Sequence, residues 1–245
     1  MTGPLDYLLV ILYTLPGAVI GLVLHELAHS VIALRAGDPT PLRENRMTLD
    51  PRRQLDPFGF PALLISGFGW GRPVPPDAPS LRRPAQRAAI VAAGPVAHLV
   101  VAAIFAVTLR VQLLTSGIDL SGFLTLSQRS AQGIVAAVLL QGYFINIALF
   151  IYNALPLPGL DGYAFLRRLL FTRASAAFIW TESNRFIAYA AVVALVVVLP
   201  QVSGGGINPL AGATVGTASL LFSHAVEPGT VPLFLGLPNI FMLFS

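Results

Sequence analysis

The chain has 245 residues, a formal net charge of +4 and a mean hydropathy of +0.75. Only 11% of its residues are charged, against about 25% in a soluble domain, and the apolar residues form long runs, so the composition indicates a protein of the lipid bilayer. The absence of cysteine excludes disulfides and thiolate ligands, which leaves His, Asp and Glu to hold any metal. The arginines lie beside apolar segments, where they orient a membrane protein and do not indicate nucleic acid as a partner.

Three long apolar stretches predict transmembrane helices, at residues 7–34, 88–109 and 132–155. Asp6 precedes the first stretch and no basic region does, so we interpret this stretch as a retained span and not as a cleaved signal peptide. The loop between the first two spans, residues 35–87, is rich in proline and arginine. Short runs within this loop predict the strands of a small β-hairpin or sheet, at 44–49, 60–66 and 70–75.

The last third of the chain leaves the number of spans open. Residues 163–185 combine four arginines with apolar residues and predict an amphipathic helix at the membrane interface, and residues 186–200 are apolar but short for a span. Residues 207–223 and 230–244 are weakly apolar and interrupted by Gly and Pro, so their topology is undecided. We predict an all-α polytopic membrane protein, a bundle of about four to six transmembrane helices with a β-hairpin in the first cytoplasmic loop. It forms one domain, 1–245, with its core at 7–200 and a C-terminal apolar extension at 201–245.

The placement of arginines predicts the orientation of the protein in a cell membrane. Nine arginines lie within residues 35–87 and four within 163–185, whereas the loop at 111–131 contains one. Because positively charged loops stay in the cytoplasm, we expect the first two segments to be cytoplasmic, and the N-terminus and the loop at 111–131 to be external.

The first span contains an HExxH motif, His25-Glu26-Leu27-Ala28-His29. Residues i and i+4 of a helix lie on one face, so the two imidazoles can bind one zinc ion, and Glu26 can act as general base toward a zinc-bound water. The alternative is a chance occurrence. In lipid that alternative is weak, because a charged group at the bilayer centre costs about 2.5–3.5 kcal/mol and is seldom kept without a function.

A catalytic zinc usually has three protein ligands, and Asp161 is the best candidate for the third. His29 lies six residues before Arg35, and Asp161 lies six residues before Arg167. If both segments are helical, both side chains lie about 9 Å inside the cytoplasmic boundary. The alternative is that Asp161 is only a turn residue before Gly162.

Asn153 lies at the end of the third span, shortly before Pro156 and Pro158. Proline removes backbone donors, and irregular backbone at membrane depth is tolerated where it lines a cavity or is buried in protein. The amide of Asn153 could donate to a developing oxyanion, or it could make an interhelical hydrogen bond.

Three sequence motifs together resemble the site-2 protease family of intramembrane metalloproteases: HELAH at 25–29, AGP at 93–95 and NALPLPGLDG at 153–162. The GWGRPVP sequence at 69–75 resembles the compact bacterial branch that lacks an inserted PDZ domain. The resemblance implies that His25, His29 and Asp161 ligate one Zn²⁺, with Glu26 and Asn153 as catalytic residues. It also implies a membrane-protein substrate whose transmembrane helix is cleaved.

The chain departs from this family at His98, where the family usually has an asparagine three residues after the Gly-Pro pair. His98 lies about 16 Å from Arg87 along a regular helix, some 7 Å from the expected depth of the zinc, so we exclude it as a ligand. It is either a neutral histidine bonded to a backbone carbonyl of a neighbouring helix, or a substrate-binding residue in the place of the family's asparagine.

The predicted function is therefore an intramembrane zinc endopeptidase that hydrolyses peptide bonds within or near transmembrane segments, with its active site near the cytoplasmic side. A strand of the first loop could bind the unwound substrate by β-augmentation. A transporter or proton pathway would also use buried ionisable groups, but it would place them along the whole membrane depth. A third alternative is an inactive scaffold stabilised by zinc.

Overall fold

The computed structural model describes residues 4–66, 69–72, 83–116 and 130–194, together with the single residues 202, 213, 216 and 217. Within these residues three helices are long and apolar enough to cross a membrane: α1 (Pro4–Arg35), α5 (Pro84–Ser116) and α7 (Ala131–Ala154). The three long apolar helices predicted at these positions and the mainly helical fold are thereby confirmed. The segments 207–223 and 230–244, and with them any further span there, lie outside the described residues.

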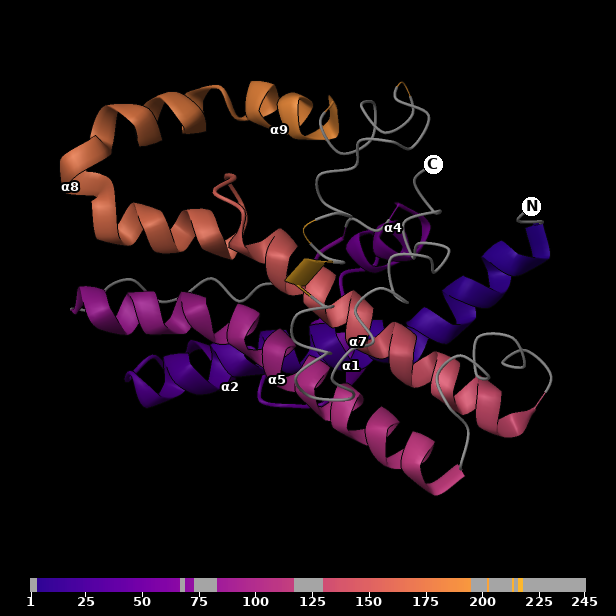
Figure 1. Ribbon diagram of the computed structural model, residues 1–245. Coiled ribbons are helices and arrows are strands. Elements are labelled where there is room, and N and C mark those ends of the chain that lie inside the picture. The colour runs from indigo at the N-terminus through magenta and orange to yellow at the C-terminus, as the bar shows by residue number, and fades with distance from the viewer. Residues whose placement is uncertain are drawn as a thin grey trace.

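The three long helices pack against one another and form the core of the protein, with the first loop and α8 arranged around them (Figure 1). One face of α5 is buried against α1 and α7, at positions such as Val101, Phe105 and Leu109. Its other face exposes a stripe of large apolar residues at helical spacing: Val96, Val100, Ile104, Val107, Val111 and Leu114. A helix that is apolar on both faces is typical of a membrane span, whose outer face meets lipid.

Small residues let the spans approach closely near the middle of the bundle. A Cβ added to Gly17 of α1 would overlap the Cα of Gly142 in α7, and one added to Gly142 would lie 2.5 Å from the ring of Phe105 in α5. Glycine at a crossing point is typical of membrane helices, which associate mainly through close packing.

The first loop folds into three short helices on the α1 side of the bundle: α2 (Thr40–Arg43), α3 (Pro51–Gln54) and α4 (Gly59–Ser66). The fully buried Gln54 donates its side-chain amide to the carbonyls of Arg46 (2.8 Å) and Thr48 (2.7 Å). The backbone N–H of Arg72 donates to the carbonyl of Gln54, and Leu55 forms an isolated antiparallel bridge with Gly71. The loop thus brings residues 69–72 back to α3.

The strand predictions for this loop were wrong at two positions. Residues 60–66 form most of α4, because Asp56 accepts the N–H groups of Phe58 (2.9 Å) and Gly59 (2.7 Å) ahead of the helix, and Pro61 is favoured in a first helical turn. Residues 44–49 contain no strand, because Asn45 adopts a positive φ of 52° and turns the chain. In the third run, the described residues 70–72 form only the bridge at Gly71, and 73–75 lie outside the described residues.

Helix α8 (Asp161–Ser183) confirms the helix predicted at 163–185, and α9 (Arg185–Val193) follows it. Figure 1 shows that α8 bends sharply near its middle, so that its second half runs back along its first half. The bend lies at Ala174, whose φ of −135° and ψ of 34° are not helical. An ion pair between Arg167 and Glu182 (2.8 Å) and a hydrogen bond from the Tyr163 hydroxyl to the Phe178 carbonyl (3.1 Å) join the two halves.

Candidate metal centre

Three side chains converge at one point between α1 and the start of α8. His25 and His29 lie one helical turn apart on α1, and their Nε2 atoms are 3.0 Å apart. Oδ2 of Asp161 lies 3.2 Å from Nε2 of His25 and 3.3 Å from Nε2 of His29. The structure therefore brings together the three residues that the sequence predicted as ligands, although Asp161 lies more than 130 positions after the two histidines.

The geometry of this cluster fits a zinc ion. With ligand distances of about 2.0–2.2 Å and tetrahedral angles, two ligand atoms of zinc lie about 3.3–3.5 Å apart. The three measured separations, from 3.0 to 3.3 Å, are close to those edges. Oδ2 of Asp161 is buried and, among the described residues, has no hydrogen-bond donor, since the two imidazole contacts lack hydrogen-bond geometry. A buried carboxylate oxygen of this kind needs a cation, and two imidazoles with one carboxylate form a ligand set typical of catalytic zinc.

The turn between α7 and α8 places Asp161. Helix α7 ends at Ala154, because Pro156 and Pro158 cannot continue the backbone hydrogen bonds. Gly159 then adopts a φ of 93°, a conformation that L side chains rarely adopt. A Cβ on Gly162 would overlap the carbonyl of Ala154, so only glycine lets α8 begin this close to the end of α7.

Helix α5 holds the imidazoles from the other side. Nδ1 of His29 lies 2.7 Å from the carbonyl of Ile90, so this nitrogen carries the hydrogen and Nε2 is left as the ligand atom. A Cβ added to Gly94 would overlap Nε2 of His29 and lie 2.7 Å from Nδ1 of His25. The glycine of the AGP motif thus lets the backbone of α5 approach both ligands.

Glu26 is buried between the ligands and the first loop. A Cβ on Gly71 would overlap its Oε1 and lie 2.8 Å from its Cδ and Cγ, so the backbone at Gly71 runs directly past the carboxylate. Arg46 is also buried and interacts electrostatically with Glu26. Burial lowers the pKa of Arg46, while the charge of Glu26 opposes this effect. Nε and Nη2 of Arg46 have no hydrogen-bond partner in the described part of the chain.

The two remaining predicted site residues, Asn153 and His98, lie outside the cluster of three ligand side chains. The amide of Asn153 donates to the Leu149 carbonyl of its own helix (2.9 Å), so its catalytic role stays a prediction. His98 is fully buried, and its ring centroid lies 4.8 Å from that of His25. The predicted difference of some 7 Å in depth between His98 and the metal site stays a prediction, but the contact between the two rings places His98 directly beside a proposed ligand. His98 remains outside the convergent ligand set.

Asn146 was not among the predicted site residues, although it is fully buried in α7 and bonded to His98 (2.9 Å). A signal was available, since a lone amide within an apolar span is expected to bond another helix. Arg46 and Tyr189 were not predicted either. The hydroxyl of Tyr189 donates to the Pro158 carbonyl (2.6 Å) and joins α9 to the turn before Asp161. No local pattern indicates either residue.

Two of the comparisons with known proteins found relatives of this chain. The profile of peptidase family M50 matches residues 13–199. The chain is 34% identical over 181 residues to "Putative zinc metalloprotease YwhC" of Bacillus subtilis (strain 168), which covers 70% of this chain and 75% of that protein. It is 32% identical over 174 residues to "Putative zinc metalloprotease Rip2" of Mycobacterium tuberculosis (strain ATCC 25618 / H37Rv), covering 66% of this chain and 59% of Rip2.

Rip2 of Mycolicibacterium smegmatis, with the same description, is 30% identical over 176 residues. The match spans less than two thirds of the Rip2 proteins, at 59% of their length. No solved structure gave a significant match. The matched region includes the HExxH helix, the AGP span and the turn that carries Asp161. The chain therefore belongs to peptidase family M50, the site-2 protease family.

Proposed function

We propose that this protein is an intramembrane zinc endopeptidase that cleaves membrane-protein substrates within or near a transmembrane segment. His25, His29 and Asp161 hold one Zn²⁺. The observation that carries the proposal is the convergence of three ligand atoms at 3.0–3.3 Å, next to a buried carboxylate, inside a bundle of apolar helices. The family and the names of its zinc metalloprotease relatives support the same reaction class.

When bound, the zinc ion supplies Lewis-acid chemistry, which polarises a peptide carbonyl and makes water acidic enough to react near neutral pH. Glu26 accepts a proton from the attacking water as the water oxygen bonds to the carbonyl carbon. It then delivers this proton to the amide nitrogen as the C–N bond breaks. His25 and Glu26 are buried, whereas His29 and Asp161 are partly exposed, so the carboxylate of Glu26 is shielded from bulk water at a site that a substrate can approach from the side of Asp161.

A transmembrane substrate must lose helical structure locally before it reacts, since a helical carbonyl is occupied by its own hydrogen bond. The backbone at Gly71 runs past Glu26, and its pairing with Leu55 is a single bridge. This short extended segment is therefore suited to pair with an unwound substrate strand beside the base. Asn153 would join the site if its amide left the Leu149 carbonyl and turned to the substrate.

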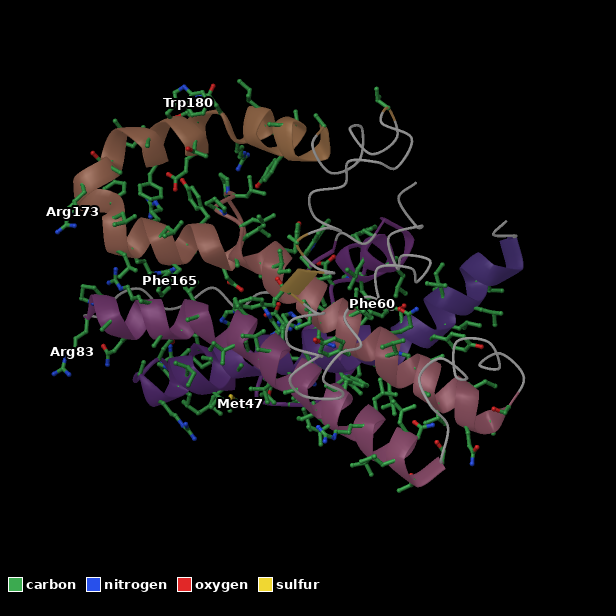
Figure 2. All side chains as sticks on the ribbon, viewed as in Figure 1. Met47, Phe60, Arg83, Phe165, Arg173 and Trp180 are labelled. Carbon is green, nitrogen blue, oxygen red and sulfur yellow. The ribbon has the colours of Figure 1, made fainter. Side chains whose placement is uncertain are left out.

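The charge distribution supports a site near the cytoplasmic side. Figure 2 shows Arg83, just before α5, and Arg173, at the bend of α8, at the same end of the molecule. Arg35 ends α1 six residues after His29. The N-terminal end of α1 lies toward the opposite end (Figure 1). Because arginine-rich ends remain in the cytoplasm, the metal centre lies closer to that face.

The test compares Glu26→Gln with the wild type in a membrane-protein cleavage assay and in zinc content. Gln is nearly isosteric but cannot accept the proton, so cleavage should fall by about 10²–10⁴-fold while zinc remains bound. Glu44→Gln, an exposed carboxylate at the end of α2, is the matched control and should cleave normally. Substrates accumulating uncut in Glu26→Gln cells would identify the target. Unchanged cleavage by Glu26→Gln would refute the proposed role of Glu26. A transporter would be favoured if the wild type cleaved no substrate and Glu26→Gln abolished ion flux.

A further inference from the structure

Two buried ring nitrogens beside the metal centre have no hydrogen-bond partner among the described residues: Nδ1 of His25 and Nε2 of His98. Their rings are 4.8 Å apart between centroids and are tilted by 40°. An unpaired polar atom in a membrane-buried core is costly, and here there are two of them on adjacent rings. An explanation for one unpaired nitrogen must therefore account for the other as well.

The hydrogen-bond network around Asn146 fixes which nitrogen of His98 carries the hydrogen. The amide nitrogen of Asn146 faces two carbonyl oxygens, those of Gly17 (3.1 Å) and Gly142 (2.8 Å), so it must be the donor to both. The other amide atom, Oδ1, is therefore an acceptor, and it lies 2.9 Å from Nδ1 of His98. His98 consequently carries its hydrogen on Nδ1, and its Nε2 has a free lone pair.

The metal centre fixes His25 in the same way. Its Nε2 lies with Nε2 of His29 and Oδ2 of Asp161 at the convergent point, so its hydrogen is on Nδ1. A metal-binding imidazole almost always donates this second N–H to an acceptor, which orients the ring and strengthens the ligand. His29 has such an acceptor in the Ile90 carbonyl, whereas His25 has none within the described residues.

We infer that His98 is the outer acceptor of His25, and that Asn146, His98 and His25 form a hydrogen-bonded relay that orients the first zinc ligand. In the metal-loaded protein Nδ1–H of His25 donates to Nε2 of His98, a bond that the two adjacent rings do not make in the described structure, and Nδ1–H of His98 donates to Oδ1 of Asn146. Asn146 is anchored to α1 and α7 by the two carbonyls. The inference rests on the proposed function, because it takes Nε2 of His25 as a metal ligand.

The relay explains features that a substrate-binding role for His98 does not. His98 is fully buried, so a substrate cannot reach it while the three helices are packed. A Cβ on Gly21 would overlap Oδ1 of Asn146, so α1 itself leaves room for the relay one turn before His25. His98 acts through His25 and is a positioning residue.

The first experiment measures zinc affinity by competition with a chelator in detergent. His98→Leu removes the acceptor and should weaken zinc binding by about 10–100-fold, the usual effect of losing an outer partner of a metal ligand. His98→Gln retains a side-chain oxygen and an amide N–H, and should recover most of the affinity. Leu109→Ala, a fully buried position three turns further along α5, is the stability control: it should lower Tm and leave zinc affinity unchanged.

The second experiment reads the hydrogen positions directly by ¹⁵N NMR of the four histidines of the metal-free wild type. His98 should show the Nδ1–H tautomer, and Asn146→Leu should remove that preference. The inference is overturned if His98→Leu binds zinc like the wild type, or if His98 shows the Nε2–H tautomer. A wild type that binds no zinc would overturn the proposed function, whereas the tautomer of His98 and its dependence on Asn146 would still decide the relay.

Discussion

Replacing Gly94 by alanine tests the metal centre with a single methyl group. The new Cβ would lie 2.5 Å from Cε1 and 2.7 Å from Nδ1 of His25, and it would overlap Nε2 of His29. Ordinary contacts begin at about 3.4 Å, so the His25 ring must retreat by about 0.7–0.9 Å. Metal–ligand distances tolerate only about 0.2 Å. We therefore expect zinc affinity to fall on the order of 100-fold, or about 2.7 kcal/mol.

Gly71→Ala is the matched comparison, because it places a methyl group on the other side of the site. Its Cβ would overlap Oε1 of Glu26 and would lie 2.8 Å from Cδ, without approaching a ligand among its nearest atoms. Zinc affinity should stay within about threefold, whereas cleavage should fall by about 10²-fold because the base is displaced. The methyl group of Gly94→Ala should thus weaken zinc binding, whereas the methyl group of Gly71→Ala should displace the base.

The assay for both variants is chelator competition for zinc, followed by cleavage at saturating zinc. Ala103→Val adds methyl groups to the exposed face of α5 and should change neither quantity. Helix propensity favours alanine over glycine by about 1 kcal/mol, so a loss in Gly94→Ala cannot be attributed to helix formation. Wild-type zinc affinity in Gly94→Ala would refute the ligand geometry, and normal cleavage by Gly71→Ala would refute the position of Glu26.

Three further outcomes test the ligand set, the α8 fold and the topology. The purified protein should hold about one zinc per chain by elemental analysis, and Asp161→Ala should lose most of it with an unchanged helical spectrum; full retention would remove Asp161 from the ligand set. Arg167→Ala should lower the free energy of unfolding by no more than about 1 kcal/mol, because its ion pair with Glu182 is 45% and 42% exposed, and a larger loss in high salt would contradict this. Reporters fused after residue 80 and near residue 120 should be cytoplasmic and external, and the reverse pattern would overturn the proposed orientation.

Hydropathy predicted the three spans well, because an apolar run of this length has few other stable environments. The ends were less accurate. Helix α5 begins at Pro84 and continues to Ser116, beyond the predicted 88–109 at both ends. Polar residues there continue the helix, and Gln112 donates to the carbonyl of Gln132 in α7 (2.7 Å). Hydropathy locates the part of a helix that lies in lipid, which is not its whole length.

The bend of α8 could not be predicted, because no glycine or proline lies near Ala174. Its stability comes from contacts between residues 15 positions apart, Arg167 with Glu182 and Tyr163 with Phe178. The strand predictions in the first loop failed for a related reason. Apolar runs of seven residues do not distinguish a strand from a short helix, and the capping contacts of Asp56 decided the outcome for residues 60–66.

The depths of Asp161 and His98 were both predicted by counting residues from an arginine, and the structure brings Asp161 to His25 and His29 and places His98 beside His25. Asp161 and His29 each lie six residues before an arginine of the same helix, Arg167 in α8 and Arg35 in α1. His98 was placed from Arg87 along a helix that begins before the arginine and packs against both other spans. A residue count measures distance along the axis of one helix. Which residues of two neighbouring helices come into contact depends on how the helices pack.

The site and the core of the bundle are built from the same contacts. Helix α1 supplies two imidazoles and the base, α5 supplies the Ile90 carbonyl and the narrow position at Gly94, and the turn from α7 to α8 places Asp161. A change in the crossing of any two spans therefore moves a ligand relative to the others. In a membrane no hydrophobic force holds helices together, and close packing and buried hydrogen bonds must do so. Asn146 bonds both neighbouring spans at their glycine crossing, so one buried amide holds the helices at the spacing that the metal centre requires.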